Sequence, residues 1–374
     1  MTSKSFFDRI EQQYNKQLPF IAYRKPNRSA VTAWLQKDAV LNMVIDFSER
    51  GFVFSPFDAI DKTILIPVEG SECISIDNYA HKHTVISPKI ENEYNSELKL
   101  NHISLVEKGV ESINNNALDK VVLSRKETIK ITDNNPIKIF KKLLAKYASA
   151  FVYCWYHPKV GLWLGATPET LIKIEGKRFS IMALAGTQSY NGTANVVWEN
   201  KEKQEQQFVT DFIVENITPF VNDTKIAETE TVKAGNLLHL KTMISAQLKP
   251  EISNLKPLIS ALHPTPAVCG VPKEKAKTFI LNHENYKREF YSGFLGELNF
   301  ETIAAPRLGK RNIENRAYAV TKKSTQLYVN LRCMKLKSNE ASIYVGGGIT
   351  KTSNAENEWR ETVSKSLVIK SILD

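Results

Sequence analysis

The sequence predicts an α+β fold in which helices cover extensive antiparallel sheet. Short apolar or alternating runs follow one another between residues 151 and 185, which is the pattern of strands. Turn candidates such as His157-Pro158 and Glu175-Gly176 separate these runs, as in an antiparallel meander. Segments with apolar residues at helical spacing lie near both ends and in the middle of the chain. A chain that combines such helices with hairpin-connected strands belongs to the α+β class.

The first hundred residues are expected to form the N-terminal part of one compact fold. They contain an amphipathic helix over Phe6–Tyr14 and several short strands, with turns near Pro26-Asn27 and Ser55-Pro56. No motif with recognisable chemistry lies among them. Neither a linker rich in Pro, Gly or Ser nor an internal repeat divides the chain, so residues 101–374 are expected to form the catalytic region of the same body.

The elements expected after residue 98 follow from the period of their apolar residues. Helices are expected over Leu98–Asn114, Trp198–Ile217 and Glu356–Leu373. Strands are expected over Lys120–Arg125, Phe151–Tyr156, Val160–Ala166, Thr170–Ile174 and Phe179–Ala185. A further hairpin is expected from Leu327–Leu336 and Ser342–Val345.

Composition excludes several classes of protein. The apolar runs of this 374-residue chain are much shorter than the roughly 20 residues of a membrane span. The N-terminus reaches Asp8 and Glu11 before any apolar stretch of signal-peptide length, which predicts a cytoplasmic protein without membrane contact. The four cysteines show no CxxC spacing and the seven histidines no HExxH, so zinc sites and disulfide scaffolds are disfavoured.

The formal net charge is +10, from 50 Lys and Arg against 40 Asp and Glu. Such a charge attracts nucleic acid, an anionic surface or a small anionic substrate. A basic nucleic-acid-binding protein would explain the charge, but no basic helix interleaved with aromatic residues and no RNA-binding signature is present. We therefore expect no nucleic-acid partner, and a basic surface that is largely solvated.

Two of the expected helices carry pairs of glutamates three residues apart, a spacing that places both on one face. The pairs are Glu202 with Glu205 and Glu358 with Glu361. The stripe that begins at Glu205 continues through Phe208 or Val209 to Phe212, on the side expected to face the core. Buried carboxylates need a partner, and oxygen ligands without His or Cys suit Mg²⁺. The alternative is that these are ordinary solvated glutamates.

Glycines after the expected strand Ser342–Val345 form a second candidate site. Gly346-Gly-Gly348 would let backbone N–H groups approach an anion, because glycine tolerates close approach and positive φ. Ordinary turn geometry is the alternative. The chain has no P-loop and no GxGxxG pattern, so nucleotide cofactors are not supported.

An ordered set of motifs carries more information than any of these features alone. The motifs are Lys120-Val-Val-Leu-Ser-Arg125, Gly165-Ala-Thr-Pro-Glu-Thr-Leu171, Leu184-Ala-Gly-Thr187, Lys201-Glu-Lys-Gln-Glu205, Leu262-His-Pro-Thr-Pro-Ala267, Arg288-Glu-Phe-Tyr-Ser-Gly293, Asn330-Leu-Arg-Cys333, Gly346-Gly-Gly-Ile349 and Glu358-Trp-Arg-Glu-Thr362. In sequence and in order they resemble the chorismate-utilising enzymes, over about two thirds of the chain. The resemblance implies that family's fold of large packed antiparallel sheets and its dependence on Mg²⁺.

The resemblance also implies which nucleophile the chain uses. By this resemblance, the family's amine-forming members have a glutamine at the position that matches Lys120, whereas its water-using members have a lysine there. Aminodeoxychorismate-forming members carry a nucleophilic lysine at the position of Ala185. Lysine at 120 and alanine at 185 imply addition of water to C2 of chorismate with loss of the C4 hydroxyl, which yields isochorismate. The alternatives are salicylate formation, in which pyruvate is eliminated afterwards, and a silent relative that binds chorismate without turnover.

Site residues follow by the same resemblance. Lys120 is matched to the base that activates water and Glu169 to the acid that protonates the departing hydroxide. Mg²⁺ on the ring carboxylate is matched to Glu205 and Glu361, with Glu202 and Glu358 acting through water and Lys365 nearby. The remaining substrate-binding residues are Gly186 and Thr187 beside the ring, His239, and Tyr291, Arg332 and Gly346 around the enolpyruvyl carboxylate.

Three departures from the family pattern stand out. Gln188-Ser-Tyr190 replaces the commoner basic residues after the Ala-Gly-Thr turn. Gln206 occupies a position that is usually histidine, directly after a metal-binding glutamate. The stretch from Glu301 to Gln326 is longer than the usual connection and is expected to be a surface insertion. The resemblance further implies a monomer, and it leaves open whether the product feeds menaquinone, a siderophore or salicylate.

Overall fold

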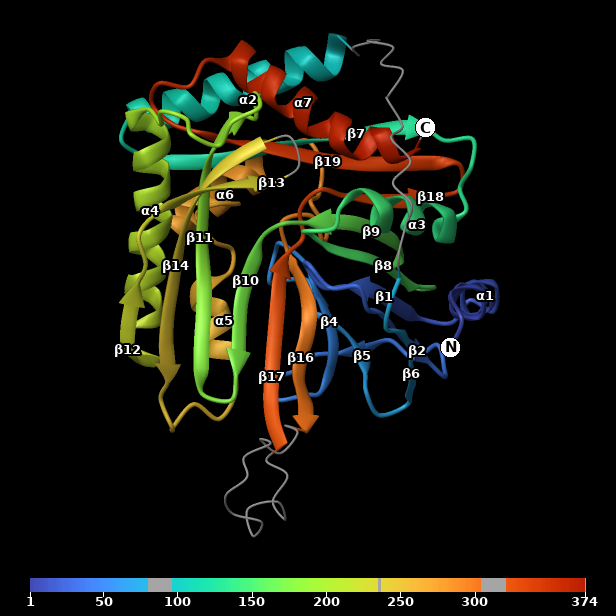
Figure 1. Ribbon diagram of the computed structural model, residues 1–374. Coiled ribbons are helices and arrows are strands. Elements are labelled where there is room, and N and C mark those ends of the chain that lie inside the picture. The colour runs from blue at the N-terminus through green and yellow to red at the C-terminus, as the bar shows by residue number, and fades with distance from the viewer. Residues whose placement is uncertain (80–95, 235–236, 304–320, 374) are drawn as a thin grey trace.

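Two large antiparallel sheets with helices around them make up the protein, which confirms the predicted fold class. The structure is a computed structural model that describes residues 1–79, 96–234, 237–303 and 321–373 (Figure 1). The helices are α1 (Ser3–Asn15), α2 (Ser96–Asn114), α3 (Pro136–Lys146), α4 (Asn200–Ile217), α5 (Lys256–Leu262), α6 (Lys273–His283) and α7 (Ala355–Leu373). Helices α3, α5 and α6 lie where the sequence analysis assigned no element. Among the helices of the described ranges, none has both the length and the apolar character needed to span a bilayer.

The first sheet has nine strands in the order β15-β7-β19-β18-β9-β8-β1-β2-β6. In chain order their bounds are β1 (Phe20–Arg24), β2 (Val31–Gln36), β6 (Ser71–Ile76), β7 (Lys120–Lys130), β8 (Phe151–His157), β9 (Gly161–Thr167), β15 (Gly270–Val271), β18 (Cys333–Lys337) and β19 (Glu340–Ile349). The longest pairing joins β7 to β19, from Lys130 opposite Glu340 to Val121 opposite Ile349.

The second sheet has ten strands in the order β12-β14-β11-β10-β17-β16-β4-β5-β3, with β13 also paired to β14. Their bounds are β3 (Asn42–Met43), β4 (Gly51–Ser55), β5 (Ile64–Pro67), β10 (Thr170–Glu175), β11 (Arg178–Ser189), β12 (Val221–Ile226), β13 (Glu230–Ala234), β14 (Leu237–Leu248), β16 (Phe294–Ile303) and β17 (Thr321–Val329). Strands from the first hundred residues therefore pair into both sheets.

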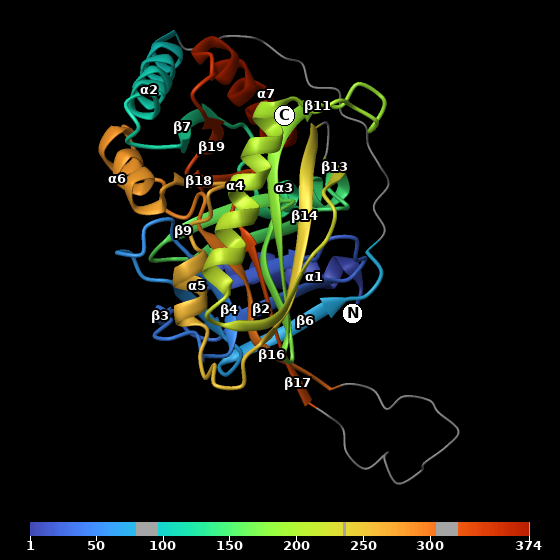
Figure 2. The ribbon, with the colours of Figure 1, turned by 90° about the vertical axis from the view of Figure 1, so that its left-hand side faces the viewer.

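Aromatic side chains fill the space between the two sheets. Phe54 of β4 stacks on Phe290 with ring centroids 4.2 Å apart, and Trp163 of β9 stacks on Tyr344 of β19 at 5.3 Å. Helices α4 and α5 cover one face of β11 and β14 (Figure 2). On that face the apolar side chains of both sheet and helices form a separate core, whose large buried apolar area stabilises the arrangement.

The buried stripe of α4 is shifted by one residue from the prediction. It consists of Gln206, Val209, Thr210, Ile213 and Ile217, whereas Glu205 and Phe212 lie at its margin. A period of 3.6 residues fixes the angular spacing of side chains but not the rotation of the helix over the sheet. As a result Glu205 faces the edge of the core, where a pocket opens.

The prediction that the four strands between residues 151 and 185 form one meander in a single sheet is wrong. Strands β8 and β9 pair in the first sheet, and β10 and β11 pair in the second, so the chain changes sheets between Thr167 and Thr170. The predicted strand Leu327–Leu336 is likewise two strands, because β17 ends at Val329 in the second sheet and β18 begins at Cys333 in the first. Alternation predicts a strand but not the sheet that it joins.

The expected insertion over 301–326 lies mostly at 304–320, outside the described residues. The two ends of this stretch, residues 301–303 and 321–326, are paired strands of the second sheet.

Candidate active site

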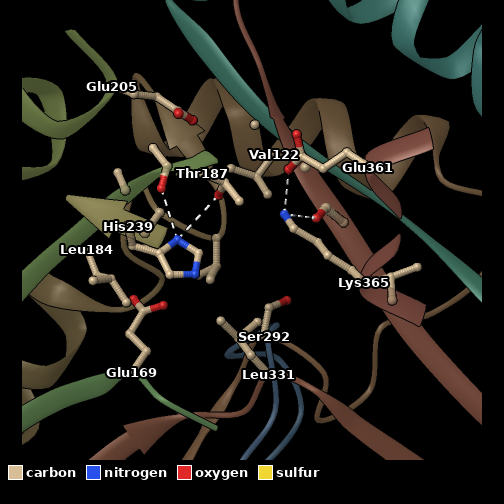
Figure 3. Close-up of a pocket in the computed structure, with 18 of the residues that line it drawn as sticks. Val122, Glu169, Leu184, Thr187, Glu205, His239, Ser292, Leu331, Glu361 and Lys365 are labelled. Atoms are coloured by element: carbon tan, nitrogen blue, oxygen red, sulfur yellow. Dashed lines mark hydrogen bonds and ion pairs between the residues drawn. The ribbon is translucent and has the colours of Figure 1, made fainter. Parts of the chain in front are cut away.

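A pocket opens where both sheets meet α4 and α7, and it collects nearly all of the predicted site residues (Figure 3). Lys120, Glu169, Gly186, Thr187, Glu202, Glu205, His239, Tyr291, Arg332, Gly346, Glu361 and Lys365 line it. Glu358 is the one predicted site residue that does not line it; this glutamate is buried beside it on α7. Residues from distant parts of the sequence are thus placed around one cavity.

Glu169 lies in the short crossover between β9 and β10. Its backbone carbonyl accepts a hydrogen bond from Val329 N at 3.0 Å, so the end of β17 holds the crossover in place. Burial raises the pKa of Glu169 to about 7, although the positive charges of Lys120 and Arg332 oppose the rise. Burial therefore favours the protonated carboxyl near neutral pH, which is the state that a general acid requires.

Lys120 begins β7 and is almost fully buried, with 1% of its side chain exposed. Its Nζ lies 2.9 Å from Oε1 of Glu205 on α4. Gly348 of β19 permits this approach, since a Cβ built there would meet Glu205 Oε1 at 2.2 Å and Lys120 Cε at 3.2 Å. The glycine run therefore makes room for charged side chains at this point, beyond any role in a turn.

The other glutamates of α4 and α7 show two kinds of environment. Glu358 is paired with Lys201 at 3.1 Å, and Glu361 with Lys365 at 2.7 Å. Burial, outweighing the charge of Lys201, raises the pKa of Glu358. Glu202 differs, because its Oε2 is buried without a hydrogen-bond partner.

These residues do not form a ready-made metal centre. Within the described part of the chain, no three His, Cys, Asp or Glu side chains converge closely enough to hold an ion. Lysine ammonium groups instead neutralise Glu205, Glu358 and Glu361. The donor set nevertheless fits Mg²⁺, because every donor is a carboxylate oxygen and Oε2 of Glu202 is buried without a hydrogen-bond partner from the protein.

His239 of β14 supports the opposite wall. Its Nδ1 lies 2.9 Å from the carbonyl of Gly186 and its Nε2 lies 3.5 Å from NH2 of Arg332. Burial and the charge of Arg332 lower the pKa of His239 to about 4, so the ring is neutral at pH 7. A neutral ring that donates from Nδ1 to the carbonyl has an acceptor at Nε2, on the side of the guanidinium.

Tyr291 and Gly346 meet at another part of the wall. A Cβ on Gly346 would lie 3.1 Å from Tyr291 Oη, so glycine keeps this contact open. The carbonyl of Gly346 accepts a hydrogen bond from Lys365 Nζ at 2.9 Å. Burial raises the pKa of Tyr291, which keeps its phenol protonated.

Comparison with known proteins identifies the family. A family model described as "chorismate binding enzyme" matches residues 68–304, and a second family model with the same description matches residues 317–371. The chain belongs to the chorismate binding enzyme family. It is 29% identical over 284 residues to the isochorismate synthase MenF of Pasteurella multocida, which covers 72% of this chain and 60% of that protein.

Other relatives place the chain within the family only coarsely. Anthranilate synthase component 1 of Lactococcus lactis is 25% identical over 296 residues, covering 74% of this chain and 60% of the relative. The chain thus spans about 60% of the length of these curated relatives. The crystal structure of DhbC from Bacillus anthracis superposes with a TM-score of 0.76 at 19% identity, covering 97% of this chain and 99% of that one, which shows the shared fold.

Some pocket residues of this chorismate binding enzyme were not predicted. They are Val122, Pro168, Leu184, Lys201, Ser292 and Leu331, together with Ala267, Val268 and Val345. All of these except Val268 and Val345 stand inside motifs quoted above, so a sequence signal was present for them. Gln206 lies behind the pocket, where its Nε2 donates to Ala183 O at 3.1 Å and to Thr242 Oγ1 at 2.9 Å.

Proposed function

We propose that this chain converts chorismate to isochorismate by adding water at C2 with loss of the C4 hydroxyl. The observation that carries the proposal is the placement of Lys120 and Glu169 on one pocket, each from a different part of the fold. Relatives named isochorismate synthases support it. Identities of 25–29% include an anthranilate synthase, so the proposed branch rests on Lys120 and Ala185.

The pocket suits a substrate with two carboxylates. Arg332, Lys201 and Lys365 bring positive charge to its wall. We assign the enolpyruvyl carboxylate to Arg332, because a guanidinium fork matches a carboxylate in shape and charge. The phenol of Tyr291 and the backbone at Gly346 lie beside that position, while Gly186 and Thr187 border the ring.

We assign Mg²⁺ to the end of the pocket that carries the glutamates of α4 and α7. Glu205 and Glu361 would hold the ion, with Glu202 and Glu358 acting through water, as oxygen donors of this kind do in partly hydrated magnesium sites. When bound there, the ion would neutralise the ring carboxylate of the substrate.

Two proton transfers complete the reaction. Lys120, as the neutral amine and not as the ammonium that pairs with Glu205, accepts a proton from the attacking water. Glu169 donates a proton to the departing hydroxide, and each transfer contributes roughly 10² to 10⁴ in rate. The raised pKa of Glu169, about 7, favours the protonated form that this role requires. Ala185 offers no nucleophile, so no covalent attachment through that position competes with water.

One experiment separates the branches. Purified protein is incubated with chorismate and Mg²⁺, and the products are identified by chromatography. Isochorismate alone is the expected product. Salicylate with pyruvate would assign the chain to the salicylate-forming branch, and an aminated ring formed with ammonia would assign it to the amine-forming branch. Binding of chorismate without any product would identify a silent relative.

A further inference from the structure

A buried arginine outside the pocket joins three segments of its wall. Arg288 lies just before the turn that carries Tyr291, and only 3% of its side chain is exposed. Its NH2 donates to the carbonyl of Val122 at 2.7 Å, and its NH1 donates to the carbonyl of Val268 at 2.9 Å and to Ser292 Oγ at 3.1 Å. Val122, Val268 and Ser292 all line the pocket, whereas Arg288 does not.

Glu284, at the end of α6, fixes the orientation of this guanidinium. Arg288 Nε lies 2.8 Å from Glu284 Oε2, and NH2 lies 2.5 Å from Oε1. The same Oε1 accepts hydrogen bonds from Ser124 N and Ser124 Oγ, both at 2.8 Å, and Tyr286 Oη lies 2.6 Å from that hydroxyl. All five N–H donors of Arg288 therefore have acceptors, and the carboxylate that balances its charge is itself held by β7.

The turn that Arg288 holds is under backbone strain. Glu289 has φ +50° and Ser292 has φ +55°, in the left-handed region that non-glycine residues rarely adopt. Such residues persist where their surroundings fix them. Arg288 bonds to the Ser292 side chain, and Asn330 accepts from Ser292 N at 2.9 Å and donates to Phe290 O at 2.8 Å.

We propose that Arg288 is a positioning residue, which sets the strand that begins at Lys120 against the turn that carries Tyr291. Val122 lies two residues after Lys120 on β7, and Ser292 follows Tyr291, so one planar guanidinium sets the distance between the proposed base and the substrate-binding wall. This proposal rests on the proposed function, because the base and the wall matter only if the pocket turns over chorismate. A misplacement of about 1 Å can cost about 100-fold in rate.

The test compares Arg288→Lys with a matched buried arginine elsewhere. Lysine keeps the charge beside Glu284 but has three donors on one atom, which cannot replace five donors on a planar fork. Arg24 is the control, since it is also buried and donates to the carbonyls of Leu144 and Tyr147, both at 2.7 Å, neither of which lines the pocket. We expect Arg288→Lys to lower kcat at least about 10-fold with KM within about 3-fold, and Arg24→Lys to lower Tm without changing kcat.

A milder variant covers the case in which Arg288→Lys does not fold. Ser124→Ala removes one hydrogen bond to Glu284 without changing any charge, and should lower kcat several-fold while KM stays constant. Amide hydrogen exchange at residues 290–293 should be faster in Arg288→Lys than in Arg24→Lys, whatever the reaction. Normal kcat in the folded Arg288→Lys and Ser124→Ala variants, or unchanged exchange, would overturn the positioning role. Absence of turnover in the unaltered protein would contradict the proposed function instead, and the exchange measurement would still decide on Arg288.

Discussion

Glu169 and Arg332 lie in two of the segments at the pocket where the chain crosses between the sheets. These two crossovers are joined by reciprocal backbone hydrogen bonds. Val329 N, before the second crossover, donates to Glu169 O at 3.0 Å, and Ala166 N, before the first, donates to Arg332 O at 3.1 Å. The guanidinium of Arg332 opposes the burial that raises the pKa of Glu169. The proposed acid and the proposed carboxylate-binding arginine are thus placed by one pair of crossovers.

The first prediction concerns pH. For Glu169 as general acid, kcat/KM should fall as pH rises through about 7, because the carboxyl then loses its proton. Glu169→Gln should lower kcat by at least about 10² with chorismate binding largely intact, and should remove this alkaline limb. Steady-state kinetics from pH 5 to 9 measure both effects. An unchanged alkaline limb in the variant would show that another group titrates there.

The same pKa predicts a change in stability with pH. The pKa of Glu169 is higher in the folded protein than in the unfolded chain, so the folded protein binds the extra proton. Its contribution to stability is complete below the unfolded value of about 4.5 and is lost as pH rises through about 7. The free energy of unfolding of Glu169→Gln should lack this dependence, which urea titrations at several pH values can measure.

The residues chosen for the candidate site lie close together in the structure, whereas the predicted arrangement of strands is partly wrong. All the proposed site residues except Glu358 line one pocket, and all of these except His239 and Lys365 stand in the ordered motifs. Residues 151–185, among them Glu169, were wrongly assigned to a single meander, because alternation of side chains is a local property. The change of sheet at Pro168 and Glu169 depends instead on partners far away in the sequence. Residues 330–332 are a second such change of sheet, because the run that was predicted as one strand continues after them in the other sheet.

Pairing of the glutamates with lysines could not be predicted either. Spacing places Glu202 and Glu205 on one face of α4, but which cation faces them depends on how α4 lies against β7 and β19. Lys201 lies in a recognised motif and Lys365 lies close after one. The sequence nevertheless does not indicate that Lys201 of α4 forms an ion pair with Glu358 of α7. Tertiary packing decides such contacts.

The second prediction concerns Lys120. Lys120→Ala should lower kcat by at least about 10², because water loses its base, and it should lower stability because the partly buried carboxylate of Glu205 loses its partner. Lys130→Ala, at the exposed far end of the same strand, is the control and should change neither. If Lys120 and Glu169 act as a unit, the double variant should lose much less than the product of the single losses. Near-normal kcat in Lys120→Ala would reduce this lysine to a structural role.

The third prediction tests the metal site through Glu202. Its Oε2 has no hydrogen-bond partner, so Glu202→Gln should change the free energy of unfolding by no more than about 0.5 kcal/mol. Mg²⁺ affinity in the presence of chorismate should nevertheless fall about 10- to 100-fold, as expected for a group that acts through water. Calorimetric titration measures the affinity directly, and Glu215→Gln on the exposed side of α4 is the control. Equal affinities for the two variants would remove Glu202 from the metal site.

The fourth prediction follows the oxygen atom. Ala185 lines the pocket from β11 and its methyl group cannot attack carbon, while Lys120 is placed to take a proton from water. Turnover in ¹⁸O-labelled water should therefore put the label on the new hydroxyl at C2 of the product, which mass spectrometry of the ring fragment detects. A parallel reaction with ammonia should give no aminated product, since nothing at positions 120 and 185 selects an amine over water. An unlabelled C2 hydroxyl would mean that the C4 oxygen migrates within the pocket, and the role of Lys120 as a base toward bulk water would then be wrong.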